Sequence, residues 1–420
     1  MSDSASTIWL TTGPDGPAAP PSGMSYSALL EMEACPRRWS LARASYSALW
    51  EGYGYPTNPS IAAFDGQIIH RSVERIIKLI VSSNIEAVDE LAFVNMMREN
   101  GGYLAIIESE IQRLGQELAE NPRLSHRRSD FEAELTGRLD ALRETVQLFV
   151  SSLEIPQVTA RNDGWNFVPD RSLRKGHYAE MELRSERIGW KGKVDHLKVT
   201  GDGCEIVDFK TGAEKPDHLL QMDIYDLLWN HDVGRNPVPL RVKRKTLVYP
   251  KKIVDVPPLS SEALEAFAES IFVRSTAAVA AISIPLPVAH ISVSNCRFCH
   301  VRQMCASYWD QNAQESLRDV QSQESIALAK SNTDLEVFLL SSISPRVWKA
   351  RVIVGMFIAP GTEILIHLGD LAGRWLDILE SNSRVRLLNV FLIRSPDDEE
   401  AATPTVGIRH SSELFVVAEN

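Results

Sequence analysis

The chain has 420 residues, of which 44% are hydrophobic and 24% are charged, and its formal net charge is −11. This length favours two or three domains, and the acidic balance disfavours a surface that is basic throughout, although local basic clusters remain possible. No apolar run is long enough to cross a bilayer, and the first residues lack the basic-then-apolar order of a secretory signal, so we expect a cytoplasmic protein without disulfides and without membrane contact.

The N-terminal part is predicted to be mainly helical. Residues 1–22 are rich in Pro, Gly and Ser, which is typical of a disordered tail. A helix capped by Ser25 or Ser27 follows, and Pro36 interrupts it or starts a new helix. Residues 64–83 carry apolar positions at three- and four-residue spacing, as an amphipathic helix does.

The pattern changes near residue 176. Short alternating runs broken by Gly over residues 177–212 indicate three strands, antiparallel or mixed. The following segments alternate between the two types of element: helix at 218–232, one or two strands at 244–258, and helix at 260–282. Helices around a small central sheet are typical of an α/β enzyme core. We assign residues 23–312 to this core and residues 86–153 to a helical insert within it.

The remaining sequence predicts a second domain. Residues 313–332 are polar and indicate a linker helix. From 333 to 420 the sequence consists of strand-like runs with one helix-like interlude at 371–381. We expect a small all-β domain here.

Acidic side chains recur near the ends of the predicted strands. Asp208 and Lys210 lie two positions apart in "DFK", so both point to the same face of a strand. Asp195 ends a G-x-x-D run on the preceding strand, and Glu182 (or Glu180) lies on the strand before that. Carboxylates are the ligands that Mg²⁺ prefers, and a lysine beside the metal can neutralise charge on a phosphate under attack. The alternative is a surface ion pair between Asp208 and Lys210, which would contribute little to the stability of the fold.

Three further features are compatible with binding. Gln221 and Tyr225 lie four residues apart on a predicted helix and could contact a nucleotide, although an amphipathic helix explains them equally. His70 is a further possible metal ligand on a predicted helix. The segment from 241 to 252 carries six cations and no acid, and could be either a solvated face or a DNA-binding surface; its first four cations are Arg241, Lys243, Arg244 and Lys245.

The cysteines are arranged as one plus three. Cys35 lies in "CPRRW", and Cys296, Cys299 and Cys305 form a C-x₂-C-x₅-C run far downstream. Four thiolates suit zinc or an iron–sulfur cluster, and such a site would join two distant segments of the chain. Cys204 has no such spacing, and we interpret it as a core residue.

These motifs, taken in order, resemble those of the RecB-like branch of the PD-(D/E)XK nucleases. The matching positions are Gly66 with His70, Glu182, Gly192 with Asp195, Asp208-Phe209-Lys210, and Gln221 with Tyr225. The segment around Cys35 resembles the opening of that branch. The four cysteines resemble its iron–sulfur subgroup, which includes the AddB nuclease domain and the CRISPR-associated four-cysteine exonucleases. The resemblance covers roughly residues 24 to 312.

The resemblance implies cleavage of DNA phosphodiesters, often at single-stranded ends, with Mg²⁺ or Mn²⁺. It implies that His70, Asp195 and Asp208 bind the metal, that Glu182 assists, and that Lys210 is catalytic. Gln221 and Tyr225 would support DNA contacts. A [4Fe–4S] cluster on the four cysteines would act as a structural staple. The chain lacks a G-x-x-x-x-G-K-[ST] loop, so we expect no helicase activity.

The strand order of residues 333–420 resembles the OB-folds of single-strand DNA-binding proteins, which use a basic groove and stacking aromatics. A small β-barrel that binds a protein partner is the alternative. The candidate stacking and phosphate-binding residues are Trp348, Phe357, Trp375, Phe391, Arg351, Arg374 and Arg394.

The sequence as a whole predicts a nuclease that acts on single-stranded DNA or DNA ends in repair, recombination or defence. Two alternatives stay open, a non-catalytic DNA-binding scaffold and a zinc-containing regulatory protein. The intact set of Asp195, Asp208 and Lys210 disfavours the scaffold. The colour of the purified protein separates zinc from a [4Fe–4S] cluster, because only the cluster is brown.

Overall fold

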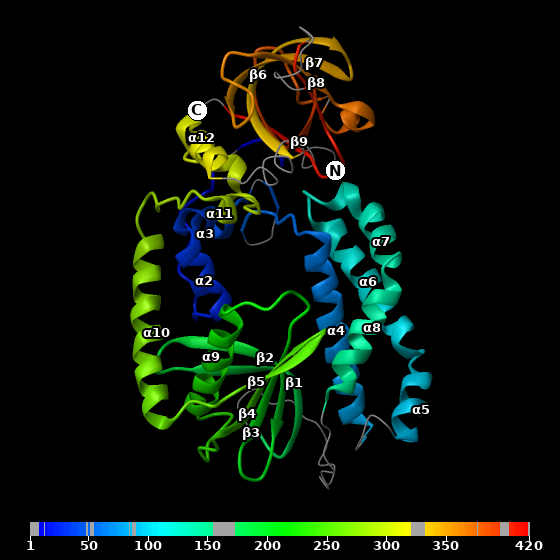
Figure 1. The fold of residues 1–420 in the computed structure, drawn as a ribbon, viewed down its shortest axis with the longest axis vertical. Coiled ribbons are helices and arrows are strands. Elements are labelled where there is room, and N and C mark those ends of the chain that lie inside the picture. The colour runs from blue at the N-terminus through cyan, green and yellow to red at the C-terminus, as the bar shows by residue number, and fades with distance from the viewer. Residues whose placement is uncertain are drawn as a thin grey trace.

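The computed structural model describes residues 8–11, 13–47, 49–50, 54–83, 85, 90–153, 173–320, 332–375, 377–394 and 403–418. A mixed sheet with helices on both faces forms the lower part of the molecule in Figure 1, and a barrel lies above it. Within these ranges no helix is both long and apolar enough to cross a membrane.

The central sheet has the order β1–β2–β3–β4–β5. Its β3–β4 pair is parallel and the other pairs are antiparallel. This mixed sheet confirms the predicted α/β core. The strands are β1 Gly176–Ser185, β2 Trp190–Val199, β3 Cys204–Phe209, β4 Val242–Tyr249 and β5 Lys252–Val256.

Two helical layers cover the sheet (Figure 1). Helices α2, α9 and α10 share a core with β1 to β4, whereas α4 and the helices between residues 91 and 151 pack around Phe209 and Val248. Ser25 caps α2 by accepting a hydrogen bond from Ala28 N, and Cys35 occupies the N-cap of α3, directly before Pro36. The helices are α2 Tyr26–Ala34, α3 Pro36–Arg43, α4 Ile61–Ser82, α5 Leu91–Glu99, α6 Gly102–Glu120, η1 Ser125–Arg127, α7 Arg128–Thr136, α8 Leu139–Ser151, α9 Asp217–His231, α10 Ser261–Ile282, α11 Val293–Cys296, η2 Arg302–Met304 and α12 Gln311–Asp319.

The C-terminal strands form a closed barrel, as the sequence predicted. Strand β10 pairs in parallel with β8 and antiparallel with β9, and β9 also pairs with β6, so five strands close on themselves. The helix-like interlude at 371–381 contains only a 3₁₀ segment, η3. The elements are β6 Thr333–Ser344, β7 Val347–Gly355, β8 Glu363–His367, η3 Gly369–Arg374, β9 Arg384–Arg394, β10 Thr405–Gly407 and β11 Glu413–Val416.

The predicted disordered tail is wrong for its described part. Ile8 and Trp9 are buried, and the Trp9 ring contacts Trp375 and Phe415. Thr11 N donates to Val416 O over 2.9 Å, and Val416 N donates to Trp9 O over 2.7 Å. The apolar residues of this short segment therefore extend the β11 edge of the barrel. Residues 1–7 lie outside the described part.

The described part of the predicted linker is packed against the barrel. Helix α12 packs against β7, where the Gln311 side chain bonds both the N–H and the C=O of Gly355. The cysteine segment and the barrel interior also share one apolar core. Asp334 of β6 accepts from Arg302 and Tyr308 over 2.6 and 2.8 Å. Residues 321–331 lie outside the described part.

Arg123 joins three parts of the molecule. Its guanidinium donates to both carboxylate oxygens of Glu413 in β11, over 2.5 and 2.7 Å. It also donates to the backbone oxygens of Pro56 and His300, over 3.1 and 2.6 Å. Only 1% of the Arg123 side chain is exposed. The helical insert, the cysteine segment and the barrel are therefore held by one buried side chain.

Replacing Arg123 with alanine should lower the free energy of unfolding by about 3–5 kcal/mol, because it leaves the buried carboxylate of Glu413 without its cation. Arg128→Ala is the matched control, since Arg128 forms an exposed ion pair with Glu132 on α7. Arg128→Ala should lower the free energy of unfolding by no more than about 0.5 kcal/mol. Chemical denaturation measures both, and equal stabilities would refute the role of Arg123.

Candidate active site

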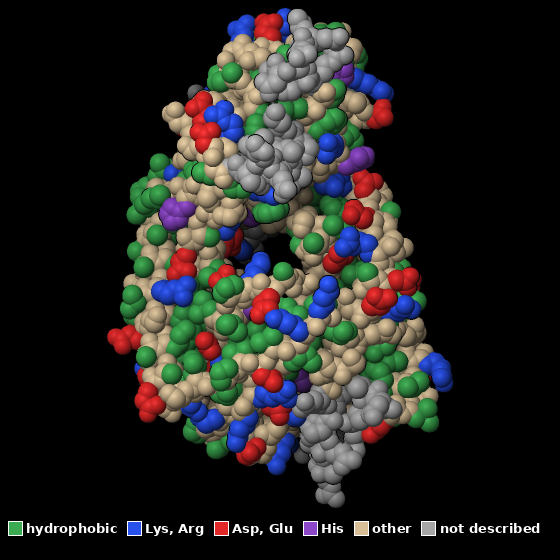
Figure 2. Space-filling model, viewed as in Figure 1, with side chains coloured by type: hydrophobic (Ala, Val, Ile, Leu, Met, Phe, Trp, Pro, Cys, Tyr) green, Lys and Arg blue, Asp and Glu red, His purple; other side chains and the backbone are tan. Residues whose placement is uncertain are grey.

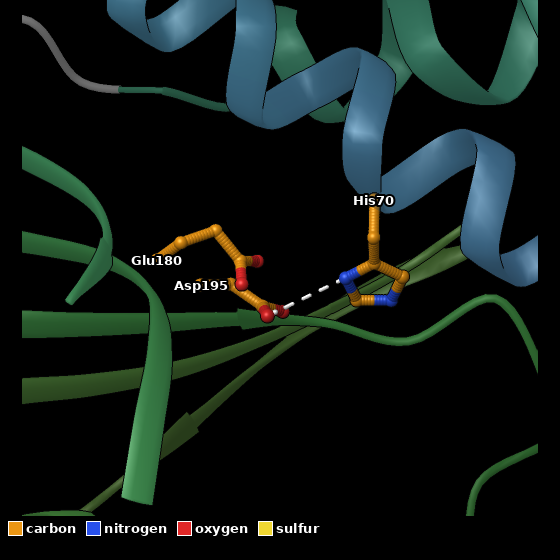
Figure 3. A group of neighbouring side chains, drawn as sticks. All are labelled: His70, Glu180 and Asp195. Carbon is orange, nitrogen blue, oxygen red and sulfur yellow. Dashed lines mark ion pairs between the residues drawn. The ribbon is translucent and has the colours of Figure 1, made fainter. Parts of the chain in front are cut away.

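Three side chains from three elements converge above the sheet. His70 of α4, Glu180 of β1 and Asp195 of β2 each offer a ligand atom, and these atoms lie within 4.8 Å of one another (Figure 3). His70 Nδ1 lies 3.4 Å from Asp195 Oδ1. All three side chains are partly exposed, so the group is accessible from solvent. A histidine and two carboxylates in this arrangement can hold a divalent cation.

The glutamate in this group is Glu180, and the choice of Glu182 as the catalytic glutamate is contradicted by its position. Glu182 points to solvent, where its carboxylate pairs with Arg184 over 2.6 Å. Glu180 has a positive φ of 52° and leaves the β1–β2 ladder between Ala179 and Met181. This backbone conformation costs energy for any residue other than glycine. It also interrupts the alternation of side chains along β1, which would have placed Glu180 and Glu182 on the same face of the strand.

Asp208 and Lys210 lie beside this group. The Lys210 ammonium is 2.5 Å from Asp208 Oδ2, so the two side chains share one face of the strand, as the sequence predicted. The backbone N–H of Phe209, between them, donates to Asp195 Oδ2 over 2.7 Å. This bond fixes the end of β3 against the carboxylate of β2.

Helix α9 holds Lys210 from the other side. Lys210 Nζ donates to Gln221 Oε1 over 2.6 Å, and Gln221 Nε2 donates to the Tyr225 hydroxyl over 2.7 Å. That hydroxyl donates in turn to Lys193 O over 2.7 Å. Tyr225 is buried, so its predicted DNA contact is wrong. Gln221 is half-buried, and its DNA contact stays a prediction.

The glycines of the motifs allow these elements to approach one another. A Cβ at Gly192 would lie 2.8 Å from Leu228 Cδ1 and 3.1 Å from the Tyr225 ring. A Cβ at Gly66 would lie 3.1 Å from the Thr211 hydroxyl, directly after Lys210. Both positions thus let a helix lie closer to the site than a larger residue would permit.

Burial and neighbouring charges shift the pKa of several groups in the site. Burial and the charge of Asp195 raise the pKa of Asp208 to about 7, against the opposing effect of Lys210. Burial and Asp195 likewise raise the pKa of Glu180, against the ion pair with Lys193. Burial would lower the pKa of His70, but the bond to Asp195 and the nearby acids raise it. A bound cation would relieve this crowding of negative charge.

Metal-free protein should therefore lose stability as the pH rises from about 4 to about 7. In this range the Asp208 carboxyl ionises in the unfolded chain but stays protonated in the folded one, and above about 7 the loss is complete. We expect Asp208→Asn to flatten this dependence and to raise the unfolding temperature at pH 8 in EDTA. Thermal scans from pH 5 to 9 provide the measurement, and an unchanged pH dependence in the variant would contradict it.

The basic segment is mostly engaged within the protein. Lys245 has no exposed surface and pairs with Asp223 and Asp226 over 2.6 and 3.3 Å, so its predicted DNA contact is wrong. Arg241 donates to Leu259 O and Asn230 Oδ1. Lys243 and Arg244 lie at the surface, where they pair with Asp202 and Asp255.

The two tryptophans predicted as stacking platforms are core residues. Trp348 is 7% exposed and Trp375 is fully buried, so neither can stack on a base, and this prediction is wrong. Trp348 lies on β7, and alternate positions of a barrel strand face inwards. Trp375 follows η3, and its ring packs against Trp9. Arg351 is exposed and shares Glu363 with Lys349. Phe357 and Phe391 are half-buried.

The segment of Cys35 lies beside the segment that carries Cys296, Cys299 and Cys305. All four are buried and none forms a disulfide. Burial raises the pKa of the Cys296 and Cys305 thiols, and Cys35 raises both further, so the two segments are in electrostatic contact. The segments are joined by backbone bonds as well: Arg37 N donates to Val288 O over 3.0 Å, and Asn295 Nδ2 donates to Ala34 O over 2.8 Å.

Sequence reasoning missed a pair beside Lys210. His218 Nδ1 lies 2.8 Å from the Tyr249 hydroxyl. Burial, Lys210 and Lys215 lower the pKa of His218, which therefore stays neutral at pH 7. The position of His218, one helical turn before Gln221, was the available signal, because residues three apart share a helix face.

A mixed sheet that carries two carboxylates and an Asp–Lys pair beside a histidine of α4 is typical of metal-dependent nucleases. The family model of the PD-(D/E)XK nuclease superfamily matches residues 23–306, and the chain belongs to that superfamily. Its members are nucleases that generally use divalent metals such as Mg²⁺ or Mn²⁺ to hydrolyse phosphodiesters.

Other comparisons add little. The solved structure titled "Crystal structure of SSO0001" is 17% identical, with a TM-score of 0.20. The match covers 31% of this chain and 59% of that one. No curated protein sequence matches the chain.

Proposed function

We propose that this protein is a RecB-like deoxyribonuclease that cleaves single-stranded DNA or DNA ends. The observation that carries the proposal is the group of His70, Glu180 and Asp195 beside the Asp208–Lys210 pair. A catalytic group of this kind is more than a DNA-binding scaffold needs. The order of the motifs along the chain, which resembles the RecB-like branch, supports DNA as the substrate.

In this proposal His70, Glu180, Asp195 and Asp208 hold the divalent metal. The residues fit such an ion, because three of them already converge and two of these three are carboxylates, the ligands that hard divalent cations prefer. When bound, the metal would activate water and offset charge on the phosphate. Mn²⁺ accepts both oxygen ligands and the imidazole, whereas Mg²⁺ favours oxygen, so we expect Mn²⁺ to support activity at least as well.

Lys210 is the proposed catalytic cation. An ammonium group has three N–H donors. Two are directed at Asp208 and Gln221, so the third remains for a phosphate oxygen or the attacking water. The Gln221–Tyr225 pair limits the rotamers of Lys210, and this pre-orientation lowers the cost of using it at the reacting phosphate. Gln221 and Tyr225 are thus positioning residues.

We further propose that Cys35, Cys296, Cys299 and Cys305 bind a [4Fe–4S] cluster. All four thiols are buried and close enough to affect one another. Their one-plus-three arrangement along the chain resembles the iron–sulfur subgroup, which favours a cluster over zinc. Arg37, Arg38 and Arg302 lie near the sulfurs and favour their thiolate forms.

The barrel is proposed to be OB-like. It has five closing strands, a parallel pair between its third and fifth strands, and a short helical segment between its third and fourth. OB-folds bind oligonucleotides, and a protein partner is the alternative use. Arg351, Arg374 and Arg394 remain proposed phosphate contacts, and the side chains of Arg374 and Arg394 lie outside the described part.

Digestion of labelled substrates tests the proposed function. Full-length protein would be incubated with end-labelled single-stranded, circular single-stranded, duplex DNA and RNA, each with Mg²⁺, Mn²⁺ or EDTA. We expect metal-dependent cleavage of linear single-stranded DNA. Absence of cleavage of every substrate with either metal would overturn the proposal, and cleavage of RNA alone would overturn the choice of DNA.

A further inference from the structure

A cavity of about 1750 Å³ lies between the barrel, the cysteine segment and the helical insert. It exceeds the 300–1,000 Å³ typical of small-molecule sites and suits an extended ligand better. Figure 2 shows that the face of the molecule is hollowed below the barrel. This region is separate from the aromatics and basic residues that the sequence analysis selected, with the exception of Phe357, which lines the cavity.

The walls of the cavity are fixed by buried polar pairs. Arg123 and Glu413 line it and bind each other, and so do Arg302 and Asp334. These four residues come from the insert, the cysteine segment and the barrel. Their charges cancel in pairs, so they give the cavity a shape without a net charge of their own.

The remaining cations of the lining are paired with aromatic rings. The Arg297 guanidinium lies 5.3 Å from the ring centre of Phe298, and the Arg127 guanidinium lies 4.4 Å from that of Phe131. Within the described part of the chain, neither Arg297 nor Arg127 has a carboxylate oxygen within 4.0 Å. Phe298 is 74% exposed, so its ring is open to a ligand.

A guanidinium next to an exposed ring offers a phosphate contact and a stacking surface together. Sequence-independent binding of single-stranded nucleic acid relies on this combination, because every base has a face on which an aromatic ring can stack. The half-buried Phe357 lies across the cavity on the barrel side. The cavity therefore has aromatic groups on two of its walls.

Helix α4 connects the cavity to the proposed catalytic group. Ser60 and Ile61, at its N-terminus, line the cavity. The positive end of the helix dipole therefore faces the cavity, which favours a phosphate there. His70 lies nine residues further along the same helix, about 14 Å away at 1.5 Å per residue. A strand that occupies the cavity can thus reach the metal group within a few nucleotides.

We infer that this cavity is a binding subsite for single-stranded DNA, in which Phe298 and Phe357 stack on bases and Arg127 and Arg297 contact phosphates. The inference rests on the proposed function and adds a subsite to it, remote from the scissile phosphate. The subsite also explains why the barrel is packed rigidly against the cysteine segment, because each of them supplies one aromatic wall.

The experiment measures binding without cleavage. Fluorescence anisotropy of a labelled oligo(dT) is recorded with full-length protein in EDTA, at several salt concentrations. Phe298→Ala and Phe357→Ala should each weaken binding about 5- to 150-fold, the range that base stacking gives. Arg127→Gln should reduce the slope of log affinity against log salt by about 0.7, which corresponds to one phosphate contact on a single strand.

Matched controls lie on exposed surface away from the cavity. Phe272 on α10 is 52% exposed and Arg98 on α5 is exposed, so Phe272→Ala and Arg98→Ala should bind like wild type. Iron content is measured for Phe298→Ala, because Phe298 lies between two cysteines. If that variant loses iron, the test of the subsite rests on Phe357→Ala and Arg127→Gln, since neither residue lies in the cysteine segment.

The outcomes separate the subsite from the proposed function. Wild-type protein that binds and cleaves DNA, together with Phe357→Ala and Arg127→Gln variants that bind with wild-type affinity and salt slope, would overturn the subsite and leave the nuclease intact. Wild-type protein that neither binds nor cleaves DNA would overturn both. Weakened binding in the cavity variants with intact controls supports the subsite.

Discussion

Glu180→Gln should reduce metal-dependent cleavage by at least about 100-fold. This loss exceeds the one usually caused by changing a residue that only hydrogen-bonds to a metal ligand. The substitution keeps the size of the side chain but removes a charged oxygen from the group with His70 and Asp195. Lys210→Ala should cause a loss of about 10²–10³-fold, as expected for a group that stabilises charge at the reacting phosphate. Initial rates on end-labelled single-stranded DNA provide the measurement.

Glu182→Gln is the matched control for Glu180→Gln. The two glutamates are two residues apart on the same strand, yet Glu182 pairs with Arg184 at the surface. We expect Glu182→Gln to cleave at close to the wild-type rate, and circular dichroism to show that all three variants are folded. Equal losses in the two glutamine variants, or wild-type activity in Glu180→Gln, would show that the metal group has been assigned to the wrong glutamate.

Cys299→Ser should remove the brown colour and most of the iron, and should lower the unfolding temperature. The proposed cluster would link Cys35 to the 296–305 segment, two parts of the chain that are otherwise joined by hydrogen bonds. The same segment carries Arg302, which binds Asp334 of the barrel, so its loss of order also weakens the barrel contact. Iron analysis, visible absorption and thermal unfolding measure these effects.

Cys204→Ser is the control, because Cys204 is buried in the sheet core away from the other cysteines. It should keep its iron and colour, although burial of the hydroxyl should lower the free energy of unfolding. Colourless wild-type protein with one zinc per chain would reject the cluster. Full iron content in serine variants of Cys35, Cys296, Cys299 and Cys305 would reject the ligand set.

Local patterns were sufficient to predict much of the core. The two-residue spacing of Asp208 and Lys210 fixed their common face, because strand side chains alternate. Ser25, Pro36 and Ser260 marked helix starts that the structure has, since capping is decided by neighbouring residues. The α/β sheet and the β-barrel followed from the change in hydrophobic period near residue 176 and again after residue 332.

The errors came from long-range packing. Glu180 and Glu182 were equivalent by alternation, and only the positive φ of Glu180 separates them. Lys245 was interpreted as surface charge, but α9 brings Asp223 and Asp226 against it. Trp348 and Trp375 had the composition of stacking residues, and only the closure of the barrel shows that they face its interior. No local pattern contains such information.

The position of the last strand has a consequence for biosynthesis. Arg123 is translated 290 residues before its partner Glu413. Trp9 and Thr11 are likewise translated long before Val416, to which their backbones are hydrogen-bonded. At 5–20 residues per second, the ribosome needs roughly 15–60 s to bridge the interval from Arg123 to Glu413. During that time the Arg123 guanidinium lacks its carboxylate partner, and the N-terminal apolar segment lacks Val416. These native contacts form only when β11 has left the ribosome, so a premature stop codon before β11 would remove them from the helical insert and the N-terminal segment as well as from the barrel.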